Sequence, residues 1–140
     1  MTYLPDVNVW IASVIPGHLQ HDAAMAWFGE AENDTVAFCR VTQMGFLRLL
    51  TNARVMEESV LTAGAAWKLL ENIRRDERIL FAPEPAGMER AWREGTNQHW
   101  SGANFWTDSF LAAFAKVTGH TLVTFDRGFA KYKAISARIL

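Results

Sequence analysis

The stretch FWTDSFLAAFAKVTGHTLVTFD, residues 105–126, contains a helical pattern that leads directly into a strand pattern. Residues 107–118 predict a helix, which Gly119 ends as a favourable terminator. The apolar run TLVTF, residues 121–125, predicts a strand. The inward positions of the helix recur at helical spacing: Phe110, Leu111, Phe114 and Val117. A helix followed at once by such a strand is typical of α/β proteins.

Short apolar runs alternate with helical segments along the rest of the chain as well. The pattern predicts strands at residues 2–5, 35–38, 79–83, 121–125 and 137–140. It predicts helices at residues 7–14, 22–32, 42–51, 59–75, 84–95 and 107–118, with Asp22 as the cap of the second. This alternation requires crossover connections, which place helices on both faces of a mostly parallel sheet. We therefore expect a three-layer α/β/α sandwich in a single domain spanning residues 1–140.

The composition is that of a folded globular protein. Half of the 140 residues are hydrophobic and 21% are charged, which excludes a disordered chain. No apolar run approaches the roughly 20 residues that span a bilayer, and the N-terminus has no secretory pattern. The single cysteine, Cys39, cannot form an internal disulfide. We expect a cytoplasmic protein without membrane association.

Basic residues are concentrated at the C-terminal end, although the net charge of the chain is only −1. From Lys116 onward, five basic residues stand against one acid, Asp126. Such a local excess attracts a polyanion such as nucleic acid, but a solvated basic tail explains it equally well.

Three aspartates fall where a parallel sheet brings residues to one edge. Asp6 follows the strand at residues 2–5, Asp126 follows the strand at residues 121–125, and Asp108 opens the helix before that strand. Ligands of α/β proteins bind at the carboxyl ends of the strands. Carboxylates gathered there repel one another unless a cation joins them, and their oxygens suit Mg²⁺ or Mn²⁺. The pattern indicates a divalent-cation site.

Each aspartate also has a local alternative. Asp6 caps a helix that begins at Val7, and Asp108, after Thr107, stands where helix caps are common. Asp126 builds a turn that ends at Gly128. The convergence of all three, rather than any one alone, favours the metal site.

Four motifs occur in an order that resembles the PIN-domain ribonucleases, and most closely the VapC-type toxins of bacterial toxin–antitoxin modules. They are LPDVNVW (4–10), TQMGFLRLLTN (42–52), FWTDSFLAAFAK (105–116) and LVTFDRGF (122–129). The resemblance covers nearly the full length. It implies a PIN-like fold and a metal-dependent endoribonuclease that hydrolyses RNA phosphodiester bonds. It also implies a homodimer and a cognate antitoxin, with aromatic residues in 92–106 in those interfaces.

The resemblance assigns roles to individual residues of this chain. Asp6, Asp108 and Asp126 match family acids that bind Mg²⁺, or alternatively Mn²⁺, and carry catalysis. Thr124 is expected to hydrogen-bond this cluster. Arg48 and Arg127 are the expected phosphate contacts and form, with Thr124, the predicted RNA-binding group; surface salt bridges are the alternative for the two arginines.

One position departs from the family pattern. A further acid, often glutamate, stands in the family where Gln43 stands here. An amide oxygen can still hold a water or a cation, but it carries no charge and cannot act as a base. Gln43 is therefore a possible metal ligand, and its presence also allows a PIN-fold protein that binds RNA or an antitoxin but cuts poorly.

A second enzyme class shares the opening motif in part. DVNV, residues 6–9, is similar to the D-x-D-x-[TV] opening of haloacid-dehalogenase-type phosphatases. Asn8 replaces the second acid of that motif, and no Asp-Asp pair follows the last strand. The phosphatase alternative therefore lacks the acid–base residue that its chemistry requires.

Overall fold

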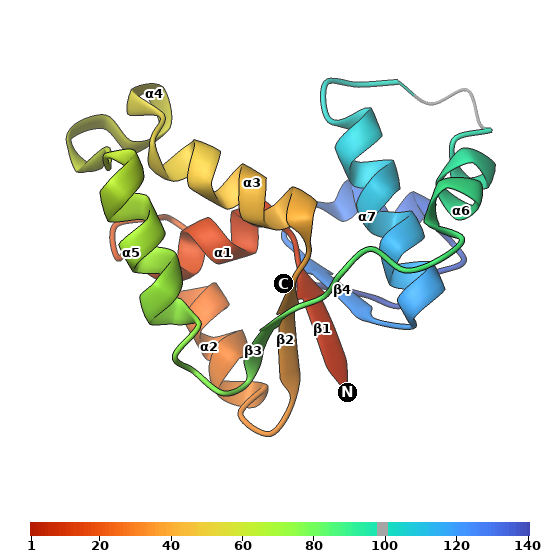
Figure 1. Ribbon diagram of the computed structural model, residues 1–140, viewed down its shortest axis with the longest axis horizontal. Coiled ribbons are helices and arrows are strands. Elements are labelled where there is room, and N and C mark those ends of the chain that lie inside the picture. The colour runs from red at the N-terminus through yellow and green to blue at the C-terminus, as the bar shows by residue number, and fades with distance from the viewer. Residues whose placement is uncertain (98–100) are drawn as a thin grey trace.

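The computed structural model describes residues 1–97 and 101–140, so part of the aromatic stretch 92–106 lies outside the described residues. Five strands form one sheet, and helices cover both of its faces (Figure 1). The strands are β1 (Thr2–Pro5), β2 (Thr35–Phe38), β3 (Ile79–Phe81), β4 (Thr121–Thr124) and β5 (Ala137–Ile139). The helices are α1 (Val7–Val14), α2 (His21–Glu30), α3 (Arg40–Leu50), α4 (Ala53–Met56), α5 (Ala63–Ile73), α6 (Met88–Gly95) and α7 (Phe105–Thr118), with 3₁₀ turns η1 (Glu57–Ser59) and η2 (Arg127–Lys131).

The sheet has the strand order β3-β2-β1-β4-β5, and each of its four strand pairs is parallel. The strand order reverses at β1, which lies in the centre between β2 and β4. Parallel pairing places the carboxyl ends of β1 and β4 side by side, with Pro5 paired to Val123 and the Asp6 amide donating to the Val123 carbonyl at 2.9 Å. The predicted α/β/α sandwich with a parallel sheet is confirmed.

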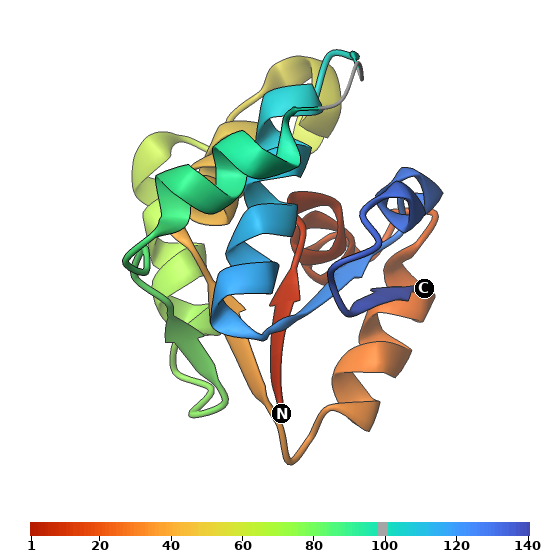
Figure 2. The ribbon, with the colours of Figure 1, turned by 90° about the vertical axis from the view of Figure 1, so that its right-hand side faces the viewer.

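Side chains alternate across the sheet and build one core on each face. Val36, Phe38 and Val123 pack with α1, α2, α3 and α5, whereas Leu4 and Leu122 pack with α6 and α7. Figure 2 shows α6 and α7 together on their face of the sheet. On the other face, the Trp10 ring of α1 stacks on Phe38 of β2 with centroids 3.7 Å apart. This stacking holds α1 against the sheet directly after Asp6.

The predicted elements all form, but several boundaries and one cap differ. α2 begins at His21 with Gln20 as its N-cap, so Asp22 lies inside the first turn and the predicted Asp22 cap is wrong. α5 begins only at Ala63, because the Thr62 hydroxyl accepts from the Ala65 amide and caps it there. α6 begins at Met88, after Gly87 in a left-handed conformation. The sequence pattern missed α4 and η1, which are too short to show a helical period.

α1 and α3 make a close contact beside the carboxyl end of the sheet. A Cβ added at Gly45 of α3 would lie 2.6 Å from Val7 Cγ2 of α1, so only glycine allows this approach. The contact fixes the first turn of α1 against the middle of α3.

Gly45→Ala is expected to lower the free energy of unfolding by about 1–3 kcal/mol, because the added methyl group overpacks this contact. Chemical denaturation of the two proteins measures the change. Gly64→Ala in α5 is the matched control, because nothing lies within 4 Å of its Cβ position. The control should be neutral or slightly stabilising, and equal effects of the two substitutions would contradict the overpacking.

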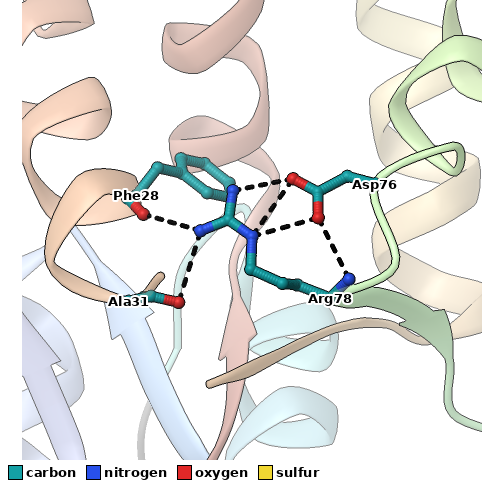
Figure 3. Close-up of polar contacts among 4 residues, drawn as sticks. All are labelled: Phe28, Ala31, Asp76 and Arg78. Carbon is teal, nitrogen blue, oxygen red and sulfur yellow. Dashed lines mark hydrogen bonds and ion pairs between the residues drawn. The ribbon is translucent and has the colours of Figure 1, made fainter. Parts of the chain in front are cut away.

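Arg78, just before β3, ties the end of α2 to the loop that follows α5 (Figure 3). Its guanidinium donates to both carboxylate oxygens of Asp76, the shortest bond being 2.7 Å. It also donates to the carbonyls of Phe28 and Ala31 at 3.0 and 3.3 Å, where α2 ends. The hydrogen bonds from Arg78 lower the pKa of Asp76 below its ordinary value.

Arg78→Met is expected to lower the free energy of unfolding by about 1–3 kcal/mol, because it removes the guanidinium hydrogen bonds to these carbonyls and to Asp76, which then keeps the Arg78 backbone amide as a donor. Arg75→Met removes an exposed arginine nearby and should change stability by less than about 0.5 kcal/mol. Denaturant unfolding of both variants measures the difference in stability. Equal unfolding midpoints in the two variants would show that the hydrogen bonds of Arg78 do not stabilise the fold.

Candidate active site

Asp6 lies at the centre of the sheet edge and is almost completely buried, with 6% of its surface exposed. It is the N-cap of α1, and its Oδ1 accepts from the amides of Asn8 and Val9 at 2.8 and 3.3 Å. Its Oδ2 accepts a hydrogen bond from the Thr124 hydroxyl. Burial raises the pKa of Asp6 above its ordinary value, although these three hydrogen bonds oppose the rise. Asp6 thus has the predicted cap role and is also fixed toward β4.

Thr124, the last residue of β4, links two of the aspartates. Its hydroxyl donates to Asp6 and accepts from the Asp126 amide at 2.9 Å. The predicted hydrogen bond from Thr124 to the acidic cluster is confirmed. Because Thr124 is fully buried, it orients the acids and is not placed to touch RNA itself.

Asp126 follows β4 and caps η2, with its Oδ1 accepting from the Gly128 amide at 2.7 Å. This is the turn that the sequence predicted. Unlike Asp6, Asp126 is exposed. The carboxylate therefore lies at the surface of the sheet edge, where a ligand can reach it.

Asp108 does not cap α7. The helix begins at Phe105 with Asn104 as its N-cap, so Asp108 lies one turn inside it and its amide donates to the Asn104 carbonyl at 2.8 Å. The alternative that Asp108 is a cap is wrong. Burial, followed by the charges of Asp126 and Asp6, raises the pKa of Asp108 to about 6, while Lys131 opposes the rise.

The three aspartates lie near enough to act on one another electrostatically. Asp126 raises the pKa of both other acids, and Asp6 raises that of Asp108. Within the described part of the chain, however, no three His, Cys, Asp or Glu side chains approach closely enough to hold a metal ion together. The case for a cation therefore rests on the shared negative charge and on the oxygen donors, which suit Mg²⁺ or Mn²⁺.

Two residues of the C-terminal segment also belong to this neighbourhood. Lys131 ends η2 and acts on Asp108, and its ammonium lies 5.3 Å from the centre of the Tyr132 ring. Burial and the charges of Asp108 and Asp126 raise the pKa of Tyr132 to about 12. Sequence reasoning missed Tyr132, because nothing in the local pattern distinguishes it from a core aromatic residue.

Gln43, at the position where the family has an acid, is buried in the first half of α3. Its Oε1 accepts a hydrogen bond from the Arg40 guanidinium, which also lies over the Phe81 ring at 4.6 Å. Arg40 was not singled out in the sequence, because its pairing depends on the helix that brings residues 40 and 43 onto one face. The amide oxygen at this position is therefore engaged by a cation of the protein itself.

The two predicted phosphate-binding arginines occupy different places. Arg127 is exposed in η2, directly after Asp126, and so lies at the acidic edge. Arg48 is exposed in the last turn of α3. A helix rises 1.5 Å per residue, which places Arg48 about 12 Å along α3 from Arg40. Arg127 therefore lies beside Asp126, whereas a phosphate contact of Arg48 stays a prediction.

Comparison with known proteins identifies the family. The PIN-domain profile matches residues 3–135. Ribonuclease VapC41 of Mycobacterium tuberculosis is 39% identical over 142 residues, which cover 98% of this chain and 97% of the relative. The chain belongs to the VapC family of PIN-domain ribonucleases. The family resemblance that the four motifs indicated is thereby confirmed, and the phosphatase alternative finds no support.

Solved VapC structures have the same fold. VapBC2 from Rickettsia felis, bound to a DNA fragment from its promoter, superposes with a TM-score of 0.72 at 15% identity, covering 99% of this chain and 98% of that one. The sarcin-ricin loop cleaving toxin VapC20 of Mycobacterium tuberculosis gives 0.69 at 19% identity, with 97% and 98% covered. Among the described residues of this VapC-family chain, none of the helices has the length and apolarity that a membrane span requires.

Proposed function

We propose that this chain is a metal-dependent endoribonuclease toxin in which Asp6, Asp108 and Asp126 form the catalytic site. The observation that carries the proposal is the convergence of these carboxylates from three separate elements, with the pKa of Asp6 and of Asp108 raised. Carboxylates that hinder one another's ionisation favour a bound cation.

The three aspartates offer the oxygen donors that a divalent cation prefers. PIN-domain nucleases depend on metal ions, and oxygen ligands with room for water suit Mg²⁺ first and Mn²⁺ as the alternative. A divalent cation at such a site activates water and stabilises the charge that develops on a phosphodiester. Asp6 and Asp108 are the proposed direct ligands of the cation. Asp126 would support a second metal position or the water that the cation activates.

The protein's own contribution is orientation. Two backbone amides and the Thr124 hydroxyl hold both oxygens of Asp6, so that carboxylate is fixed before any ligand arrives. Asp126 and Arg127 lie on the surface at the start of η2. There, Arg127 can pair with a substrate phosphate.

An antitoxin partner follows from the family and from its solved relatives. Structural neighbours of this chain include antitoxin complexes, among them VapBC2 of Rickettsia felis and FitAB. We propose that a cognate antitoxin binds this chain and covers the acidic edge. We also propose that the chain is a single domain spanning residues 1–140 and that it forms a homodimer. The exposed Trp106 ring, which packs edge-on against Trp92, is a candidate interface residue. Cellular RNA as the substrate places the enzyme in the cytoplasm.

Gln43→Glu is expected to change the rate of metal-dependent RNA cleavage by less than about threefold, because the new carboxylate would pair with Arg40 rather than join the aspartates. The same substitution in an Arg40→Ala background is the matched comparison, since there the carboxylate has lost this partner. Cleavage rates at saturating Mg²⁺ measure both. A gain of tenfold or more in the single variant would mean that Gln43 impairs the native site, as the poorly cutting alternative requires.

Incubation of the purified chain with structured cellular RNA tests the proposed function. We expect discrete fragments with Mg²⁺ or Mn²⁺, and none with EDTA in place of the metal. Intact RNA in the presence of both metals, or fragments that persist in EDTA, would overturn the proposal.

A further inference from the structure

A hollow of about 450 Å³ lies between α6, α7 and residues 131–135 of the C-terminal segment. We call it the α7 hollow. It adjoins the acidic site, since its lining includes Ser109, which follows Asp108 in α7, and Lys131 and Tyr132, which lie within electrostatic reach of Asp108. The helices that wall it lie together on one face of the sheet (Figure 2).

The rim of the α7 hollow carries positive charge. Lys116 comes from α7, and Lys131 and Lys133 come from the C-terminal segment. Among the described residues of the lining, the acid is Glu94, which pairs with Arg90 at 3.1 Å. Lys131 also acts on Asp108, so Lys116 and Lys133 are the lysines whose charge favours an anionic ligand here.

The interior of the hollow is apolar and bears an aromatic ring. Ala112 and Ala113 of α7 offer small side chains to it, and Ile135 closes it from the C-terminal segment. The Tyr132 ring forms part of the same wall. Small apolar walls beside an aromatic ring accept a flat base by stacking, while lysines outside them hold phosphates.

We propose that the α7 hollow binds one nucleotide of the single-stranded RNA substrate, next to the phosphodiester that the aspartates address. The base enters the apolar interior and the adjoining phosphates contact Lys116 and Lys133. This inference rests on the proposed function and adds to it a subsite that selects unpaired RNA. Continuity with the acidic edge and the excess of lysines favour RNA over a protein segment as the occupant.

Binding without cleavage tests the subsite directly. The probe is a fluorescein-labelled single-stranded RNA of ten nucleotides, titrated in EDTA. The double variant Lys116→Glu/Lys133→Glu should bind it at least about tenfold more weakly, and the dependence of log Kd on log salt should become shallower by about 1.4, because two phosphate contacts are lost. Both lysines are exposed, so the fold should be retained; thermal melting checks this.

The matched control carries the same charge change on the other face of the sheet. Lys68→Glu/Arg75→Glu alters two exposed residues at α5 and should leave the Kd within about twofold. If both double variants lost RNA affinity equally, the change in net charge would explain the loss and the subsite would be wrong.

A substitution that changes no charge tests whether the shape of the hollow matters for RNA binding. Ala134 is exposed and lines the hollow, so Ala134→Trp narrows it. We expect weaker RNA binding with an unchanged salt slope. Wild-type affinity in this variant would contradict entry of a base. The proposal would also be wrong if adenosine monophosphate displaced the RNA when the two were present at equal concentration. That result would show that the hollow binds a free nucleotide.

Cleavage assays distinguish failure of the subsite from failure of the proposed function. If the wild type cleaves RNA and Lys116→Glu/Lys133→Glu does so with unchanged KM and cleavage sites, the subsite is wrong and the ribonuclease stands. If the wild type does not cleave but its RNA binding is lost in that variant, the ribonuclease proposal is wrong and the RNA site stands.

Discussion

Asp6→Asn is expected to lower the rate of metal-dependent RNA cleavage by about a thousandfold or more. Loss of one carboxylate from a catalytic metal site removes several kcal/mol of transition-state stabilisation, and each 1.36 kcal/mol is a factor of about ten in rate. Asp6 is held at the carboxyl end of the central strand by α1 and Thr124, so asparagine would occupy the same place without the charge.

The substitution leaves the fold intact, which makes the result specific. Asparagine retains a side-chain oxygen that accepts from the amides of Asn8 and Val9, so the cap of α1 persists. Asp22→Asn, at an exposed carboxylate in the first turn of α2, is the matched control and should keep wild-type activity. Cleavage by Asp6→Asn within threefold of the wild type would remove Asp6 from the catalytic site.

Asp108→Asn is expected to have opposite effects on activity and stability. We expect at least a hundredfold loss of cleavage, because a metal ligand is lost, together with a higher melting temperature of the metal-free protein at pH 7. The stability gain follows from the raised pKa: charging Asp108 in the fold is costly because of burial and the two neighbouring aspartates.

The pH dependence of this effect has a definite sign. The folded-state pKa of Asp108, about 6, lies above its ordinary value of 3.8, so between these values the folded state binds the proton more tightly than the unfolded state. Stability from this group is therefore present at low pH and is lost as the pH rises through about 6. Melting of wild type and Asp108→Asn in EDTA from pH 4 to 8 measures the difference, which should grow in favour of the variant with rising pH. Parallel profiles would contradict the raised pKa.

The sequence was sufficient to predict the layers of this fold, because in most elements the spacing of the apolar residues agrees with the residues that end the element. Gly119 ends α7 in a left-handed conformation, as expected, and TLVT then forms β4. Starts were less predictable, because they depend on which residue supplies the cap. The helix predicted to begin at Ser59 begins at Ala63 in the structure, because Thr62 is the cap of α5.

The site was predictable to the extent that topology determines it. Asp6 and Asp126 follow neighbouring parallel strands, so their meeting at one edge needs only the strand order. The error at Asp108 arose because α7 begins at Phe105, two residues before the predicted start, so Asp108 lies in the first turn and not at the cap. The place of Arg40 over the Phe81 ring and that of Tyr132 near Asp108 depend on packing between distant segments, which no local pattern contains.

Calorimetric titration of Mn²⁺ into the RNA-free protein at pH 7.5 tests most directly whether the three aspartates form a metal site. We expect binding to the wild type and at least about tenfold weaker binding to Asp6→Asn and to Asp108→Asn, with Asp22→Asn unchanged. Wild-type Mn²⁺ affinity in both Asp6→Asn and Asp108→Asn, or no binding to the wild type at all, would contradict a metal centre at this edge of the sheet.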